Sequence, residues 1–290
     1  MVQNESNHVG IFHFNYRRCI MTASSYRIGI LSLATLAACS TVERPHEESH
    51  ETHWDYAELG PRVWGTLNPE FSICGTGQLQ SPIDIGTAAP GDLPGIRASF
   101  RAAELHIVHH EHRADIVNTG HSIQVNYPES DTLFIGDESY ALIQYHFHSP
   151  SEHQVSGRSF PAEVHFVHQA QDGRLAVIGV LVEEGEANPA YDPIWQNLPP
   201  EKNHPIHLEH VTVDVDALLP PETNSVRYQG SLTTPPCKEG VEWIVMTTPV
   251  TMSSTQLTSL RSLLSGNNRP IQGAFNRAVI LDRIPELGSR

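Results

Sequence analysis

Short segments in which apolar and polar residues alternate recur from His53 onward, and they restrict the fold more than any other feature of the chain. β-Branched and aromatic residues are frequent in them, and Gly, Pro, Asn or Asp separates them, which is the pattern of half-buried strands. The clearest segments are Leu105–His109, Ser122–Tyr127, Ala141–His148, Glu163–His168 and Leu175–Val182. We therefore expect one mainly β domain with an extended antiparallel sheet and peripheral helices.

Helical signals are few. Leucines at 257, 260, 263 and 264 follow the spacing of one helix face. Ser254 opens this segment and is a residue type that caps helix N-termini well. Pro189–Leu198 is a second candidate helix.

The N-terminal region has the features of an export signal, so it is left out of the fold prediction. Arg27 precedes the apolar run Ile28–Ala38. This run is too short for a transmembrane helix, which needs about 20 apolar residues. Residues 1–38 are therefore predicted to form an export segment, and Met21 is an alternative start that gives a signal of conventional length.

The end of the apolar run, Leu36-Ala-Ala-Cys39, resembles a bacterial lipobox. We expect Cys39 to be acylated, residues 39–51 to form a flexible polar linker, and residues 52–288 to form the folded domain. Ser40 favours anchoring to the outer membrane in the periplasm of a Gram-negative host. The alternative is an ordinary signal peptide, which leaves a soluble periplasmic or secreted protein.

The chain is acidic, with a formal net charge of -15 at pH 7. Nucleic acids and anionic membranes attract an excess of Lys and Arg, so neither is an expected partner, and membrane contact is expected only through the lipid on Cys39. Two of the four cysteines, Cys74 and Cys237, lie in the domain. In an exported chain such a pair indicates a disulfide, and two buried free thiols are the alternative.

Three histidines in two strand segments form a candidate metal site. His146 and His148 are two residues apart, so both rings leave the same face of a strand, and His165 lies in the next such segment. Three imidazoles with an open fourth position are typical of catalytic zinc, whereas structural zinc usually has four protein ligands. Gln144 and Glu163 share faces with these histidines and can accept their second N–H groups.

A coincidental arrangement is the alternative. The chain has 18 histidines, so a His-x-His pair is unsurprising. His168, on the opposite strand face, and the cluster of His109, His110 and His112 fit surface or structural positions better. Spacing alone leaves both interpretations open.

Several motifs resemble those of the α-carbonic anhydrases and follow the order of that family. The motifs are Gln144–His153 and Ala162–His168 for the zinc segments, Gly230–Cys237 for the active-site loop, His53–Tyr56 with Gln80–Asp84 near the N-terminus, and Asn268–Gln272 near the C-terminus. They cover nearly all of the chain beyond the export segment. Ser149-Pro150 replaces the Trp-Gly of animal members, so the chain is most similar to the bacterial, exported branch and to plant members.

The resemblance implies a large, mostly antiparallel twisted sheet, with zinc at the base of a conical cavity, in a catalytic domain of residues 52–288. It implies zinc ligation by His146, His148 and His165, with Gln144, Glu163 and the Asn268 backbone as their outer hydrogen-bond partners. The implied substrate site consists of the orienting pair Thr233 and Glu152, Thr234 for bicarbonate, the proton shuttle His121, and an apolar carbon dioxide pocket of Val167, Val177, Leu232, Val241 and Trp243. Cys74 and Cys237 match the disulfide of secreted members.

The implied activity is zinc-dependent, reversible hydration of carbon dioxide to bicarbonate and a proton by zinc-bound hydroxide, with ester hydrolysis as a side reaction. Two other functional classes are alternatives. A binding domain of the same fold could have lost the metal, but all three histidines are retained. A zinc hydrolase that acts mainly on esters is the other alternative, but the chain lacks a glutamate of the H-E-x-x-H type that could act as a protease base. A homodimer is a further expectation.

Overall fold

The computed structural model describes residues 52–86, 88–91, 96–99, 102–105, 115–127, 131–207, 211–222, 224–264 and 266–283, which belong to one compact unit, His50–Arg290. The predicted export segment and linker, Cys39 and the histidines at 109, 110 and 112 lie outside the described residues. Within the described part, no helix is both long enough and apolar enough to cross a membrane.

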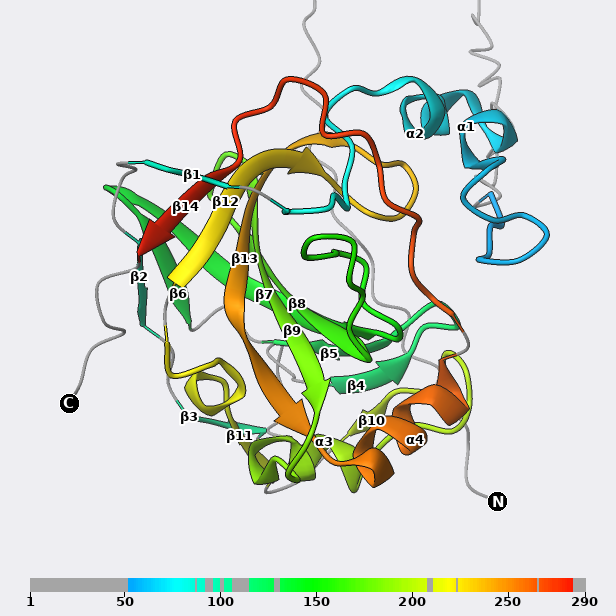
Figure 1. The fold of residues 1–290 in the computed structure, drawn as a ribbon. Helices are drawn as coiled ribbons and strands as arrows, with labels where there is room; N and C mark the ends of the chain where they lie inside the picture. Colours follow the sequence, from blue (N-terminus) through cyan, green and yellow to red (C-terminus); the bar gives the residue numbers. More distant parts are fainter. Residues whose placement is uncertain are drawn as a thin grey trace, which may run out of the picture. The chain divides into compact units, whose positions relative to one another are not determined.

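A twelve-stranded sheet carries the domain, as the alternating segments predict (Figure 1). Its main path contains β1 (Ala89–Pro90), β14 (Ile280–Arg283), β12 (Asn224–Ser231), β13 (Glu239–Met252), β9 (Leu175–Glu184), β8 (Ala162–Gln169), β7 (Glu138–His148), β5 (Ile123–Asn126), β4 (Asp115–Asn118) and β10 (Ile206–His207), in that order. Off this path lie β6 (Thr132–Ile135), which pairs with β7, and β2 (Ile96–Ser99), which pairs with β6. A separate two-stranded sheet joins β3 (Ala102–Leu105) to β11 (Val211–Asp214).

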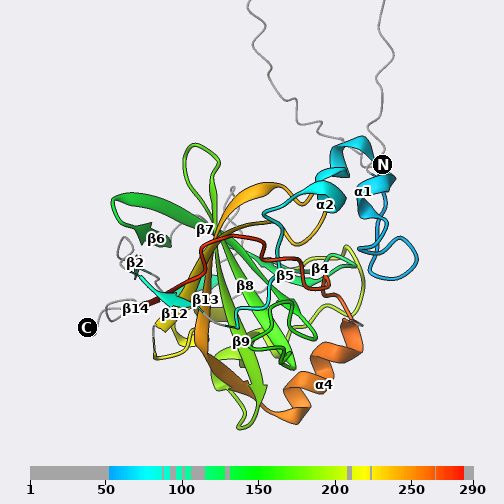
Figure 2. The ribbon, with the colours of Figure 1, turned by 45° about the horizontal axis from the view of Figure 1, so that its top comes forward.

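The strand pairs are mostly antiparallel, which confirms the predicted sheet type. Two of the described pairs, β9 with β13 and β1 with β14, are parallel. Strands β7, β8 and β9 lie in the middle of the path, and Figure 2 shows them side by side. Seven successive residues of β8 are buried, which is expected of a strand that is covered on both faces.

The two faces of the central strands have different contents. On one face, alternate residues such as Phe147, Phe166 and Ile244 join a large apolar core. On the other face, Val167 and Trp243 join a second apolar cluster beside the histidines. The period of two thus places a packed core behind the sheet and the candidate site in front of it.

Helices are short and lie at the periphery (Figure 1). The α-helices are α1 (Trp64–Leu67), α2 (Ile73–Thr76), α3 (Asp192–Trp195) and α4 (Ser254–Leu263), and the 3-10 turns are η1 (Pro69–Phe71), η2 (Pro189–Tyr191) and η3 (Asp216–Leu218). The predicted Pro189–Leu198 helix is divided into η2 and α3. Prolines at 189 and 193 lack the N–H that a continuous helix would use.

Helix α4 confirms the leucine spacing, but the predicted cap was wrong by one residue. Ser253, not Ser254, caps the helix: its hydroxyl accepts from the Gln256 N–H at 3.2 Å, and the Gln256 side chain accepts from the Ser253 N–H at 3.0 Å. This reciprocal pair needs a Gln or Glu three residues after the cap, which Ser253 has and Ser254 lacks.

The predicted disulfide between Cys74 and Cys237 is present, with the two Cα atoms 5.0 Å apart. It joins α2 to the loop between β12 and β13 across 163 residues of sequence. Both cysteines are buried against Trp64 in a small apolar cluster. The disulfide therefore fixes this loop to the N-terminal part of the domain.

Replacement of both cysteines by alanine should lower the free energy of unfolding by about 2–5 kcal/mol, because a cross-link over so long a loop restricts the unfolded chain. Urea unfolding of the oxidised protein, the reduced protein and the double variant measures the effect. The oxidised, denatured wild type should also leave no thiol on either cysteine for a thiol reagent. Labelling of both, or equal stability of the three samples, would contradict the prediction.

Candidate metal centre

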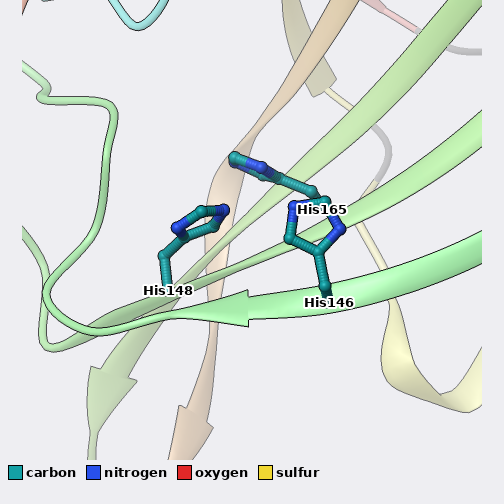
Figure 3. A group of neighbouring side chains, drawn as sticks. All are labelled: His146, His148 and His165. Carbon is teal, nitrogen blue, oxygen red and sulfur yellow. The ribbon is translucent and has the colours of Figure 1, made fainter. Parts of the chain in front are cut away.

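The three predicted ligand histidines meet on one face of two neighbouring strands. His146 and His148 come from β7 and His165 from β8, and the antiparallel register places His165 directly opposite His146. Figure 3 shows the three rings turned toward one another. One ring nitrogen from each lies within 4.8 Å of the others, and His148 and His165 are each only 1% exposed.

Each ring uses its other nitrogen for a hydrogen bond to a fixed acceptor. His146 Nδ1 donates to Gln144 Oε1 at 2.8 Å, and His165 Nε2 donates to Glu163 Oε1 at 2.9 Å, both as predicted. These bonds set the tautomers, so that His146 Nε2 and His165 Nδ1 remain free to bind a metal.

The third outer bond corrects the sequence prediction. His148 Nδ1 donates to the backbone oxygen of Asn267 at 2.6 Å, and not to that of Asn268. Gly266, with a φ of 67°, turns the chain so that Asn267 is buried while Asn268 is half-exposed. Two adjacent asparagines look alike in a motif, and only the backbone path distinguishes which carbonyl faces the site.

The charge state of the histidines suits metal binding. Burial lowers the pKa of His146, and the neighbouring His148 and His165 lower it further. Burial also lowers the pKa of His148, although the Glu152 carboxylate opposes this effect. Both rings are therefore neutral at pH 7, which is the form of histidine that binds a metal.

Glu163 supports this arrangement as a carboxylate that accepts four hydrogen bonds. Its donors are the ring of His165, the ring of His153, and the backbone N–H groups of Glu152 and His153, at 2.7–2.9 Å. Burial raises the pKa of Glu163, but the charges and hydrogen bonds of His153 and His165 outweigh burial and hold it well below its usual range.

Two buried polar atoms at the site, one in the His148 ring and one on Glu152, indicate what the site binds. Neither His148 Nε2 nor Glu152 Oε2 has a hydrogen-bond partner among the described residues, and the two atoms are 3.6 Å apart. Glu152 Oε2 is also 3.9 Å from His165 Nδ1. Buried polar atoms normally have partners, so their lack of one here fits a cation and its bound solvent. Three imidazoles without a cysteine are the donor set of catalytic zinc.

Glu152 lies beside His148 and His165, but the predicted hydrogen bond between Thr233 and Glu152 is not formed. Glu152 Oε1 accepts from the Arg269 N–H at 2.7 Å, and Oε2 has no partner among the described residues. Thr233 is 6% exposed in the β12–β13 loop, which Cys237 anchors, and Thr234 is half-buried in the same loop. The orienting role of this pair therefore remains a prediction.

His121 lies in the turn between β4 and β5, near the start of β5 as predicted. Its half-buried ring stacks on Trp54, with centroids 3.8 Å apart and planes 13° apart, and Tyr56 approaches at 6.5 Å. The Asn267 side-chain amide donates to the His121 carbonyl oxygen at 2.9 Å. The same asparagine thus contacts His121 and the ligand His148.

The predicted apolar pocket residues are brought together on the site face of the sheet. Val167, Val177, Val241 and Trp243 are buried in one cluster, and Leu232 packs against it. The Trp243 ring lies 4.8 Å from that of His165. These five side chains therefore form an apolar wall next to the ligands.

Several residues that contact the site were not assigned a role from sequence. His153 Nε2 lies 2.7 Å from the Tyr228 hydroxyl, and Ser81 Oγ lies 2.9 Å from the same hydroxyl, which continues the hydrogen-bond chain from Glu163. Arg269 is 1% exposed and donates to oxygens of Cys74, Gln80 and Ser81, near the start of the folded domain. Both networks join residues far apart in sequence, so no local pattern marks them.

His168 has the structural role that the sequence suggested. It is fully buried on the core face of β8, and burial lowers its pKa to about 4. A neutral histidine on that face cannot reach the metal site on the other.

Comparison with known proteins gives one family. A sequence profile of the eukaryotic-type carbonic anhydrases matches residues 59–282. A carbonic anhydrase of Pectobacterium atrosepticum is 39% identical over 249 residues, covering 84% of this chain and 96% of the relative. The solved α-carbonic anhydrase of Thermovibrio ammonificans, in complex with the inhibitor sulfanilamide, is 38% identical with a TM-score of 0.74, covering 79% of this chain and 99% of that one. Dioscorin DB3L of Dioscorea polystachya is 35% identical over 267 residues, covering 87% of this chain and 92% of the relative.

Proposed function

Because the chain belongs to the eukaryotic-type (α) carbonic anhydrase family, we propose that it catalyses the reversible hydration of carbon dioxide to bicarbonate and a proton. His146, His148 and His165 hold one Zn²⁺ in this proposal. The observation that carries it is the set of three oriented rings, together with two atoms, His148 Nε2 and Glu152 Oε2, that have no hydrogen-bond partner among the described residues.

When bound, zinc acts as a Lewis acid and lowers the pKa of the water that it binds to about 7. Carbonic anhydrases are themselves the standard example of this effect. The residues of this chain contribute the rest. Gln144, Glu163 and the Asn267 carbonyl hold the three rings in the tautomers that face the metal. This fixed geometry avoids the cost of reorganising the site during the reaction.

Thr233 and Glu152 orient the attacking hydroxide in our proposal. The Thr233 hydroxyl accepts its hydrogen and donates in turn to Glu152 Oε2, which has no other hydrogen-bond partner among the described residues and therefore has room for this bond. This hydrogen bond to Thr233 directs a lone pair of the hydroxide oxygen at the carbon of the substrate. Thr234, next in the loop, binds bicarbonate in this proposal.

Carbon dioxide is small and uncharged, so apolar contacts must supply most of its binding. Val167, Val177, Leu232, Val241 and Trp243 supply these contacts. Such a pocket binds the substrate only weakly, and therefore most of the acceleration must come from the activated nucleophile and its orientation.

Zinc analysis together with a carbon dioxide hydration assay tests the proposed function. Purified protein should contain one zinc per chain, lose hydration activity with a strong chelator, and regain it with added Zn²⁺ but not Mg²⁺. A protein without bound zinc that binds small organic molecules would instead favour the alternative of a binding domain that has lost the metal. Activated esters should be hydrolysed more slowly than carbon dioxide is hydrated, because ester hydrolysis is a side reaction in this proposal.

His121→Ala should lower kcat in dilute buffer by about tenfold or more while leaving kcat/KM nearly unchanged, because each turnover releases a proton after the attack on carbon dioxide. Histidine is the side chain whose ordinary pKa, about 6.5, suits proton relay near neutral pH. Stopped-flow assays over a range of buffer concentrations measure both constants, and added imidazole should restore the rate. An unchanged kcat in dilute buffer, or no rescue, would rule out the relay.

We further propose that Cys39 carries a lipid that anchors the protein to the outer membrane. The lipobox-like Leu36-Ala-Ala-Cys39 and the polar residues after it support this proposal. Cys39→Ala should move the protein from the membrane fraction to the soluble fraction. A wild-type protein already in the soluble periplasmic fraction would indicate ordinary signal-peptide cleavage instead.

A further inference from the structure

Asn267 is a buried residue in the segment between α4 and β14, here called the C-terminal segment, which passes the three histidines. It is 4% exposed and follows α4 and Gly266. The sequence motif near the C-terminus begins one residue later, at Asn268, and does not include it. Its backbone carbonyl accepts from the ligand His148, as described above.

The side-chain amide of Asn267 uses both of its donors and its acceptor. Oδ1 accepts from the Ser149 N–H at 2.9 Å, and Nδ2 donates to the Phe147 carbonyl oxygen at 2.9 Å. The second hydrogen of Nδ2 goes to the His121 carbonyl oxygen, also at 2.9 Å. Both N–H groups of the amide thus donate to backbone carbonyl oxygens, and its oxygen accepts from a backbone N–H.

These bonds enclose the ligand His148. Phe147 and Ser149 are its two neighbours in the chain, so Asn267 holds the backbone on both sides of the ligand and accepts from the ligand ring itself. The remaining bond reaches the turn that carries His121. One side chain thus fixes the end of β7 and the β4–β5 turn to each other.

Asn267 is itself held in place by the residues that follow it. The Arg269 guanidinium donates to Gln80 Oε1, to the Ser81 carbonyl oxygen and to the Cys74 carbonyl oxygen at 2.8–2.9 Å. The Arg269 N–H donates to Glu152 Oε1. The C-terminal segment is therefore anchored independently of the Asn267 amide, and a substitution of that amide should leave the segment in place.

We infer that the side-chain amide of Asn267 is a positioning group that holds the backbone on both sides of the ligand His148 and fixes the place of the His121 turn relative to it. The inference rests on the proposed function, because it assigns the two histidines the roles of metal ligand and proton relay. Ser122 forms a second link between the same turn and β7, since its hydroxyl donates to the Phe147 carbonyl oxygen at 2.9 Å. Loss of the Asn267 amide should therefore displace His121 without unfolding the turn.

Two substitutions separate the bonds. Asn267→Asp has the same shape and still accepts from the Ser149 N–H, but it replaces both donors with an oxygen that faces two carbonyl oxygens. Asn267→Ala removes all three side-chain bonds and adds no charge, while the backbone carbonyl remains. Asn268→Asp and Asn268→Ala are matched controls at the half-exposed neighbour.

The first readout is the rate at which the zinc-loaded protein releases zinc to a chelator. Both Asn267 variants should release zinc about tenfold faster, because outer-shell groups that orient a ligand typically contribute 10–100-fold to metal affinity. The second readout is kcat in dilute buffer, which should fall several-fold more than kcat/KM. In a His121→Ala background, substitution of Asn267 should cause no further fall in this buffer-dependent kcat.

Unchanged zinc release in both Asn267 variants, or equal effects of the Asn268 controls, would overturn the inference. So would a lower unfolding midpoint accompanied by neither faster zinc release nor a selective loss of kcat, because that result describes a structural residue only. Failure of the proposed function gives a different result, namely a wild type without hydration activity. If His121→Ala alone has no effect on kcat, the relay is wrong, and the zinc-release rate decides the positioning of His148.

Discussion

His165→Ala is expected to lose most of its zinc and its carbon dioxide hydration activity. The substitution leaves two ligands, and it also removes one of the four donors to the buried Glu163 carboxylate. Loss of a mere outer partner weakens metal binding roughly 10–100-fold. Removal of a ligand should exceed this, so we expect kcat/KM to fall by more than about 10³-fold.

Zinc content by elemental analysis and stopped-flow hydration measure the effect. His204→Ala is a matched control, because it removes a histidine whose side chain is 77% exposed. Circular dichroism should show the same sheet content in all three proteins. A His165→Ala protein with one zinc per chain and wild-type activity would contradict the ligand assignment.

Thr233→Ala should keep its zinc but lower kcat/KM by about 10²-fold, because the three ligands stay while the orienting hydroxyl is lost. Removal of one preorganised hydrogen-bonding group at a reacting oxygen typically costs 10²–10³-fold. Thr233 lies in a loop that the disulfide fixes, so the alanine variant should keep the loop conformation.

Thr233→Ser is the matched control for this substitution, since it retains the hydroxyl and should recover most of the rate. Zinc content and kcat/KM are measured for both variants. Wild-type kcat/KM in the alanine variant, or an equal loss in the serine variant, would refute the orienting role of the hydroxyl.

The sequence predicted the mainly β fold well because the strands bury their two faces differently. The segment Ala141–His148 lies within β7, and Glu163–His168 lies within β8, so the period of two correctly placed the three histidines on one face. The same alternation does not encode strand direction. The parallel pairing of β9 with β13 therefore had to come from the structure.

Parts of the site escaped prediction because they depend on contacts between distant segments. The hydrogen bond from His148 to Asn267 spans 119 residues, and the choice of Asn267 over Asn268 depends on the backbone turn at Gly266. The bond from His153 to Tyr228 spans 75 residues. Such bonds satisfy buried polar groups that the fold creates, and a single segment carries no trace of its partner.

The register of β7 with β8 has a consequence for the order in which the site is assembled. The three histidines proposed as zinc ligands belong to one antiparallel strand pair, within 20 residues of sequence, so the loop that must close to gather them is short. Asn267 is synthesised long after them. The strand pair that carries all three imidazoles is thus complete in sequence before the C-terminal segment begins. The last segment to be made then supplies the acceptor that fixes the His148 ring.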